Sequence, residues 1–305
     1  MLEIFKTTDT GLKRIKKPVR GSWINIVIPT EEDERFLYSH TKIKKEDIES
    51  LLDIDEIPSV EKYGEDYFIL IKTPQKDGGE LEYSTVPLGI YLSDKYFITI
   101  CFWENDCIRR LKKTDFSTGK RIRTTLKLLY ISSKLYLEYL KEIQKKIYVI
   151  QKDLEKSMRN EEMIHLLNLE KSLIYFTTSL RSNYILIEKL TKNRLFTRYK
   201  EDNELLEDVL EETIQAIDMA NIYSNILSGM MDAFASIISN NLNMVMKLLA
   251  SITIILMIPT LIASIYGMNI SLPFQTSPHA FLLIISLSIL FSIIGVIIFW
   301  KARLF

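Results

Sequence analysis

The chain has few of the residues on which disulfide scaffolds and common zinc sites depend. Its 305 residues include only two cysteines, Cys101 and Cys107, which form no CxxC pair, and three histidines that form no HExxH motif. We therefore expect neither a disulfide framework nor a zinc ribbon. No nucleophile–His–acid constellation is apparent, which argues against a hydrolytic enzyme. Lys and Arg together number 39, as do Asp and Glu, and this zero net charge argues against a nucleic-acid partner.

Proline and glycine are missing from one long region. No proline lies between Pro87 and Pro259, and neither residue occurs from Lys120 to Ser228. A segment of this length without helix breakers favours long helices. We therefore expect helical hairpins over residues 119–200.

The preceding region has the opposite character, with short β-rich runs between turn signals. The runs are Trp23–Ile28, Tyr67–Ile71, Val86–Leu92 and Tyr96–Phe102, the turn signals include Asp77-Gly78-Gly79 and Ser93-Asp94, and a charged helical pattern covers Lys44–Leu52. Such runs between Gly, Asp and Ser residues are typical of strands. The sequence therefore predicts an α/β domain over residues 1–118.

Charge is absent from two segments near the C-terminus. Leu248–Tyr266 has 19 uncharged residues and Ala280–Trp300 has 21. An apolar run of about 20 residues matches the roughly 30 Å hydrocarbon core of a bilayer. The alternative is a pair of buried core helices. We predict two membrane spans, at about 247–267 and at 280–300, which places the chain in contact with membrane lipid.

Basic residues near these segments predict their orientation. Lys247 precedes the first span, whereas Lys301 and Arg303 follow the second, and Gly267–His279 contains no Lys or Arg. Because positive residues favour the cytoplasmic side, both termini are expected in the cytoplasm. The predicted outer loop is 268–279 and the cytoplasmic tail is 301–305. The protein is thus expected in the cell membrane.

A long stalk helix is predicted over residues 201–267, continuing as the first span. From Glu201 to Met246 it contains nine acids and no Lys or Arg. An acidic region that leads into a membrane span would concentrate cations. A solvated acidic face is the alternative.

A stripe of small and polar residues follows this helix at alternating steps of three and four. It comprises Asp232, Ser236, Ser239, Asn243, Met246, Ala250, Thr253, Met257, Thr260, Ser264 and Gly267. This spacing keeps the stripe on one face, which is costly against lipid but suits protein or water. A small-residue packing seam is one interpretation, and a pore wall is the other. Because one helix cannot enclose a pore, a pore requires a homo-oligomer with ring symmetry.

The end of the first span resembles the signature of the CorA family of magnesium transporters. Tyr266-Gly267-Met268-Asn269 lies where members carry YGMN, before a short loop and a last span. Trp23-Ile24-Asn25-Ile26 resembles the family's early strand, and Lys247, Pro259-Thr260 and Asp232 fit the same pattern. The resemblance covers nearly the whole chain. It implies an α/β cytoplasmic domain, a helical stalk, two transmembrane helices and a homopentameric channel for Mg²⁺.

The resemblance also implies roles for individual residues. Gly267, Met268 and Asn269 would form a selectivity filter, because Gly267 carbonyls and Asn269 amide oxygens can accept hydrogen bonds from hydrated Mg²⁺. Further along the pore, rings of oxygen atoms would come from Thr260, Thr253, Asn243 and Asp232, and Ser264 and Ser239 would line the same wall. The apolar residues Met257, Met246 and Leu249 are candidates for a constriction of the pore.

A second, regulatory Mg²⁺ site is implied between subunits. Asp208 and Glu211 match the stalk side of the family's cytoplasmic metal site, and Glu49 or Asp53 would lie across the interface. Ser50 stands where members usually carry an acid. The expected ligand is Mg²⁺, both transported and regulatory, without an organic cofactor.

Two other functions remain open from the sequence. A transporter of the same family could carry Co²⁺, Ni²⁺ or Zn²⁺, although related zinc transporters tend to vary the middle residue of GMN, so that Met268 favours Mg²⁺. A membrane-anchored helical scaffold without a pore is the other alternative. No nucleotide site is expected, since Ser117-Thr118-Gly119-Lys120 lacks the remaining residues of a P-loop.

Overall fold

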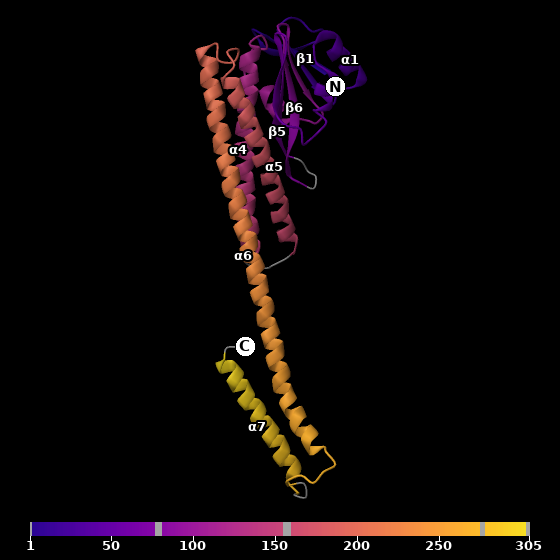
Figure 1. The fold of residues 1–305 in the computed structure, drawn as a ribbon, viewed down its shortest axis with the longest axis vertical. Coiled ribbons are helices and arrows are strands. Elements are labelled where there is room, and N and C mark those ends of the chain that lie inside the picture. The colour runs from indigo at the N-terminus through magenta and orange to yellow at the C-terminus, as the bar shows by residue number, and fades with distance from the viewer. Residues whose placement is uncertain (1, 77–80, 155–159, 275–277, 303–305) are drawn as a thin grey trace. The chain divides into compact units, whose positions relative to one another are not determined.

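The computed structural model describes residues 2–76, 81–154, 160–274 and 278–302. Two compact units make up the chain, Met1–Met230 and Met231–Phe305. The expected α/β segment and the helical hairpin lie together in the first unit (Figure 1). The Asp77-Gly78-Gly79 turn and Arg303 lie outside the described residues.

The first unit contains a seven-stranded sheet in the order β2-β1-β3-β7-β6-β5-β4. The strands are β1 (Leu2–Thr8), β2 (Gly11–Ile15), β3 (Ser22–Val27), β4 (Ser59–Tyr63), β5 (Asp66–Lys76), β6 (Tyr83–Leu92) and β7 (Tyr96–Cys101). The central pair β3 and β7 is parallel and the other pairs are antiparallel. All four predicted β-rich runs form strands, whereas β1, β2 and β4 were not predicted.

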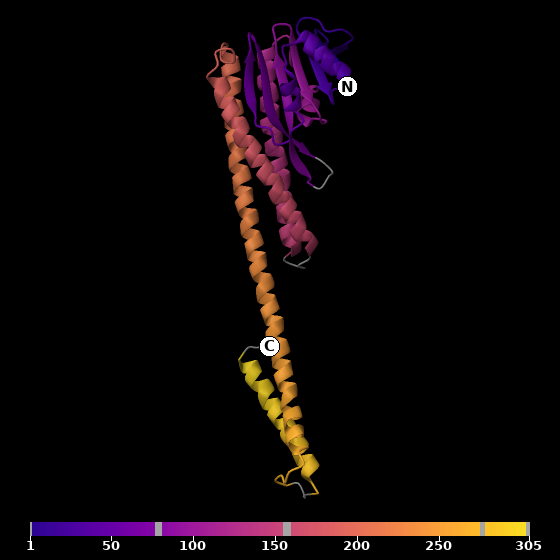
Figure 2. The ribbon, with the colours of Figure 1, turned by 45° about the vertical axis from the view of Figure 1, so that its right-hand side comes forward.

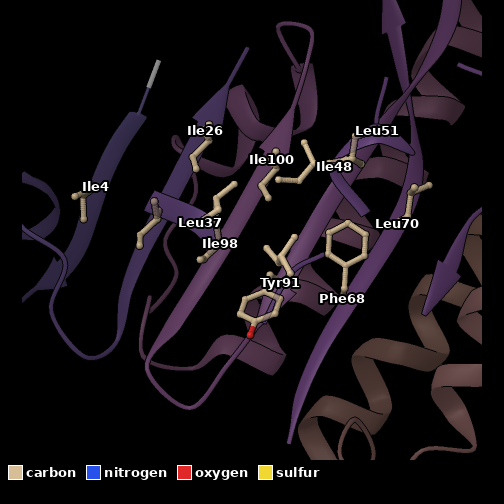
Figure 3. Close-up of a cluster of buried hydrophobic side chains, with 12 residues drawn as sticks. Ile4, Ile26, Leu37, Ile48, Leu51, Phe68, Leu70, Tyr91, Ile98 and Ile100 are labelled. Carbon is tan, nitrogen blue, oxygen red and sulfur yellow. The ribbon is translucent and has the colours of Figure 1, made fainter. Parts of the chain in front are cut away.

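One face of the sheet is covered by α1 (Glu31–His40) and α2 (Lys45–Glu49). The core on this face joins Leu37 of α1 and Ile48 of α2 to aliphatic and aromatic side chains of the strands (Figure 3). Ile26, Ile98 and Ile100 contribute from the parallel pair. This packing fixes α2, and with it the acidic residues that follow α2, against the sheet.

The helical hairpin covers the opposite face of the sheet, as Figures 1 and 2 show. It consists of α4 (Arg121–Leu154) and α5 (Asn160–Thr191), and the short α3 (Asp106–Leu111) packs beside α4. Tyr136 of α4 and Phe176 of α5 are completely buried, with ring centroids 5.0 Å apart in an edge-to-face arrangement. Such pairs stabilise an interface beyond the burial of their area.

Gly89 of β6 permits close packing of Leu51 against the sheet. A Cβ atom at this position would lie 2.8 Å from Leu51 Cδ1 and 3.1 Å from Phe68 Cε2. We expect Gly89→Ala to lower the free energy of unfolding by about 1–3 kcal/mol, the usual cost of overpacking a core. Thermal unfolding of the full chain in detergent would measure this. Gly119→Ala is the matched control, because its Cβ would meet only Ser117 Oγ, at 3.8 Å; equal melting temperatures for the two variants would contradict the packing argument.

A single helix, α6 (Lys200–Tyr266), follows the hairpin and has 67 residues. In the first unit its buried residues recur at alternating steps of three and four: Asp202, Leu206, Val209, Thr213, Ala216, Ala220, Tyr223 and Leu227. Thr213 Oγ1 hydrogen bonds to Ser133 Oγ of α4 at 2.9 Å, and Glu212 forms a salt bridge with Lys134. This face of α6 therefore packs against the hairpin.

The second unit contains the end of α6 and α7 (Ala280–Lys301), which lie side by side (Figures 1 and 2). Each helix contains an apolar stretch that is long enough to cross a membrane, and only 6% of that stretch is buried. A soluble protein would bury such surface, so the alternative of two core helices does not fit. The architecture agrees with the predicted fold class.

Candidate ion pathway and cation sensor

One face of the membrane part of α6 packs against α7. Ser251 is only 3% exposed, and Ile255, Ile258 and Ile262 follow it at helical spacing with partial burial. On α7 the inward positions Ser288, Ser292 and Gly295 are small. A Cβ atom at Gly295 would lie 3.3 Å from Ile258 Cδ1, so glycine lets the two helices approach closely here. We call this face of α6 the α7 seam.

The polar stripe lies on the other side of the same helix. At about 100° per residue, Thr253, Met257 and Thr260 point roughly 180° away from the α7 seam. All three side chains are exposed, as is Ser264. The helix packing within this chain therefore leaves the stripe uncovered. No described residue of this chain covers the stripe, which is therefore open to water or to another protein chain.

The threonine hydroxyls of the stripe are held by their own helix. Thr253 Oγ1 donates to the Leu249 carbonyl at 2.8 Å, and Thr260 Oγ1 donates to the Leu256 carbonyl at 3.2 Å. A hydroxyl has one proton and two acceptor lone pairs. With the proton engaged, both side chains present oxygen acceptors along the stripe, as a hydrated cation requires.

The predicted filter residues begin where α6 ends. The Gly267 N–H donates to the Ala263 carbonyl at 2.9 Å, whereas the Met268 N–H reaches the Ile265 carbonyl at 3.2 Å in a tighter turn. Gly267, Met268 and Asn269 are all exposed. The helix thus places these three residues directly after the stripe, with Met268 and Asn269 outside its regular hydrogen bonding.

Counted along the sequence, the heptad phase of the stripe continues upstream into the first unit, and the structure adds that these positions are exposed. The positions in this phase are Glu201, Glu204, Asp208, Glu211, Gln215, Asp218, Ile222, Asn225 and Gly229, and every one of them is exposed. By this count the predicted metal ligands Asp208 and Glu211 belong to the same heptad phase as the stripe.

The acidic residues at the start of α6 differ in their partners. Five of the seven have one: Glu201 and Asp202 face Arg123 at 2.6 and 3.7 Å, Glu204 faces Lys200 at 3.7 Å, Glu207 accepts from Asn203, and Glu212 faces Lys134. Arg123 lowers the pKa of Glu201, whereas burial raises the pKa of Asp202. Within the described part of the chain, Asp208 and Glu211 form no ion pair.

The two candidate acids of the α/β domain have local partners. Glu49 Oε1 lies 3.0 Å from Lys45 Nζ on the exposed face of α2, and Asp53 Oδ1 accepts the Asp55 N–H at 2.8 Å. No three His, Cys, Asp or Glu side chains among the described residues are grouped as a metal site.

The fold and these exposed apolar helices define a two-span membrane protein with a large α/β domain. The chain belongs to the CorA family, because the model of the CorA-like Mg²⁺ transporter protein matches residues 20–301. It is therefore a membrane transport protein for Mg²⁺ and not an enzyme.

Individual relatives show how far the similarity extends. A cobalt/magnesium transport protein CorA of Methanocaldococcus jannaschii is 33% identical over 288 residues, covering 92% of this chain and 90% of the relative. One from Thermotoga maritima is 27% identical, covering 87% and 78%. The complete structure of the CorA magnesium transporter from Methanocaldococcus jannaschii has a TM-score of 0.86 at 29% identity, covering 99% of this chain and 98% of that one. The full-length CmaX structure, at 15% identity and a TM-score of 0.73, shares the fold.

Proposed function

We propose that five copies of the chain form a Mg²⁺ channel in the cell membrane, with the stripe of each copy on the pore axis. The observation that carries the proposal is that α7 packs on the opposite side of α6 and leaves the stripe uncovered. With both termini in the cytoplasm, Gly267–Asn269 forms the outer entrance. The membrane potential drives uptake, since a divalent ion gains about 4.6 kcal/mol per 100 mV.

Selection rests on neutral oxygen acceptors. Mg²⁺ gives up its waters reluctantly and prefers octahedral oxygen ligands. A ring of Asn269 amides and Gly267 carbonyls would bind the hydrated ion weakly enough for release. Thr260, Thr253, Ser239, Asn243 and Asp232 supply further oxygens, whereas Met257, Met246 and Leu249 narrow the path.

Co²⁺ is the second candidate ion, because relatives from two organisms are named cobalt/magnesium transport proteins. Purified protein in liposomes, with Mg²⁺, Co²⁺ and Zn²⁺ flux measured in parallel, tests both ions. Mg²⁺ flux that grows with an inside-negative potential supports the proposal. Absence of flux for all three ions would instead favour a non-conducting scaffold.

The position of the stripe can be tested by thiol labelling. With Cys101 and Cys107 replaced, single cysteines at Asn243, Met246, Thr253 and Met257 should react with small hydrophilic thiol reagents, and the modification should block flux. Cysteines at Ile252 and at the seam position Ile255 are the controls, because neither belongs to the stripe. Equal reactivity at the control positions would mean that another face lines the pore.

We also propose that internal Mg²⁺ closes the channel. In a ring of subunits the unpaired carboxylates Asp208 and Glu211 repel each other, and bound Mg²⁺ would join them to Glu49 or Asp53 of a neighbouring copy. When internal Mg²⁺ falls, the repulsion returns and the stalks separate. A ligand that binds the closed state better in this way produces negative feedback.

A further inference from the structure

A buried lysine lies beneath the acidic loop of the α/β domain. Lys72 of β5 is only 4% exposed, and its ammonium donates a hydrogen bond to the carbonyl of Ile54. Lysine is rarely buried unless it is paired, because removing an ammonium from water is costly. A buried lysine in this position therefore calls for an explanation beyond packing.

The backbone of Lys72 is fixed from the hairpin side. Its strand neighbour β4 pairs only as far as Leu70, so the strand edge is open at Lys72. The Asn183 side chain of α5 closes this edge, accepting from the Lys72 N–H at 3.0 Å and donating to its carbonyl at 2.7 Å. Tyr136 OH donates to the same carbonyl at 3.2 Å. The lysine thus extends from a rigid support.

The segment that Lys72 holds, residues 52–57, has an unusual composition for a surface loop. Leu52, Ile54 and Ile57 are exposed aliphatic residues, and Asp53, Asp55 and Glu56 lie between them. Burial lowers the pKa of Lys72, while Asp55, Asp53 and Glu56 act in the opposite direction, so the loop carboxylates and the ammonium are electrostatically coupled. Three exposed aliphatic side chains beside acids are compatible with a contact with another chain.

We propose that Lys72 is a positioning residue of the internal-cation sensor. Its ammonium holds the Ile54 carbonyl and thereby fixes residues 52–57, with Asp53, in the geometry in which Mg²⁺ can bridge to Asp208 and Glu211 of a neighbouring copy. The inference rests on the proposed inhibition by internal Mg²⁺. It also names Asp53 as the ligand, because Asp53 lies in the segment that Lys72 holds, whereas Glu49 lies on α2.

The test measures the internal Mg²⁺ concentration that halves the flux of full-length protein in liposomes. Lys72→Met removes the donor and the charge. Loss of the charge alone would strengthen cation binding by the loop carboxylates and lower the half-inhibiting concentration. We expect instead that the loss of positioning raises this concentration at least fivefold, while flux at zero internal Mg²⁺ is unchanged. Lys72→Arg retains a charged donor and should stay close to wild type. Lys62→Met removes an exposed lysine of neighbouring β4 and should have no effect.

The outcomes separate the two proposals. If internal Mg²⁺ inhibits wild type and Lys72→Met at the same concentration, the role of Lys72 is overturned and the sensor proposal stands. A wild type without inhibition overturns both. General destabilisation would lower the melting temperature and the flux at zero internal Mg²⁺, with no selective change in the half-inhibiting concentration.

Should Lys72→Met fail to fold, Lys72→Gln takes its place, and an unshifted half-inhibiting concentration there also overturns the proposal. Hydrogen exchange of residues 52–57 should be faster in each neutral variant.

Discussion

Asn269→Ala is expected to reduce Mg²⁺ flux by about a hundredfold. In a pentamer it removes five amide acceptors, and at about 0.5–1.5 kcal/mol for each hydrogen bond even the lower value corresponds to a factor of about sixty. The loss is expected to concern the hydrated ion, because the Asn269 side chain is exposed in the turn that follows α6. Liposome flux under a fixed potential measures the effect.

Two further variants show whether the loss concerns selection. Asn269→Asp supplies one carboxylate per copy and should change the preference among Mg²⁺, Co²⁺ and Zn²⁺ without abolishing flux. Ser271→Ala, two residues further along the same exposed loop, is the matched control and should conduct normally. Wild-type Mg²⁺ flux through Asn269→Ala would remove Asn269 from the filter.

Neutralising the two unpaired stalk acids should strongly weaken inhibition by internal Mg²⁺. The double variant Asp208→Asn, Glu211→Gln preserves side-chain shape but removes the charges that Mg²⁺ would bridge. We expect the half-inhibiting concentration to rise at least tenfold, with ion selectivity intact because the filter residues are unchanged. The readout is flux against internal Mg²⁺.

A control with equal charge change separates ligation from general electrostatics. Glu204→Gln and Glu207→Gln remove two acids of the same helix that have partners within the chain. If the half-inhibiting Mg²⁺ concentration of this control stays near that of wild type, the two unpaired acids act specifically. Equal shifts of that concentration in both double variants would indicate a general effect of negative charge. Unchanged inhibition in Asp208→Asn, Glu211→Gln would place the sensor elsewhere.

The sequence predicted the central strands but not the edges of the sheet. Strands β3, β5, β6 and β7 are buried on both faces, so their aliphatic runs are continuous and easy to recognise. By contrast, β2 (Gly11–Ile15) contains Lys13 and Arg14 and is largely exposed, as suits an edge strand. Its hydrophobic pattern is too weak to distinguish a strand from a loop.

For the ion pathway, the sequence predicted the stripe but not the surfaces around it. The heptad spacing of polar residues in an apolar helix is visible without a structure, because lipid cannot solvate such a face. The role of Ser288, Ser292 and Gly295 as the contact for α6 depends on which side of α7 faces inward, and a uniformly apolar helix gives no such signal. The contact between the Lys72 backbone and Asn183, 111 residues away, was also unpredictable from the sequence.

The back-bonded threonines of the stripe have a consequence for anions. Chloride and phosphate are solvated by hydrogen-bond donors, and a hydroxyl lining a pore could ordinarily rotate to supply one. At Thr253 and Thr260 the only proton is committed to a carbonyl of the preceding turn. In the proposed pore an anion would meet oxygen lone pairs at both levels, so such rings would exclude negative ions without carrying a formal charge, and a cation would pass them without being trapped by a carboxylate.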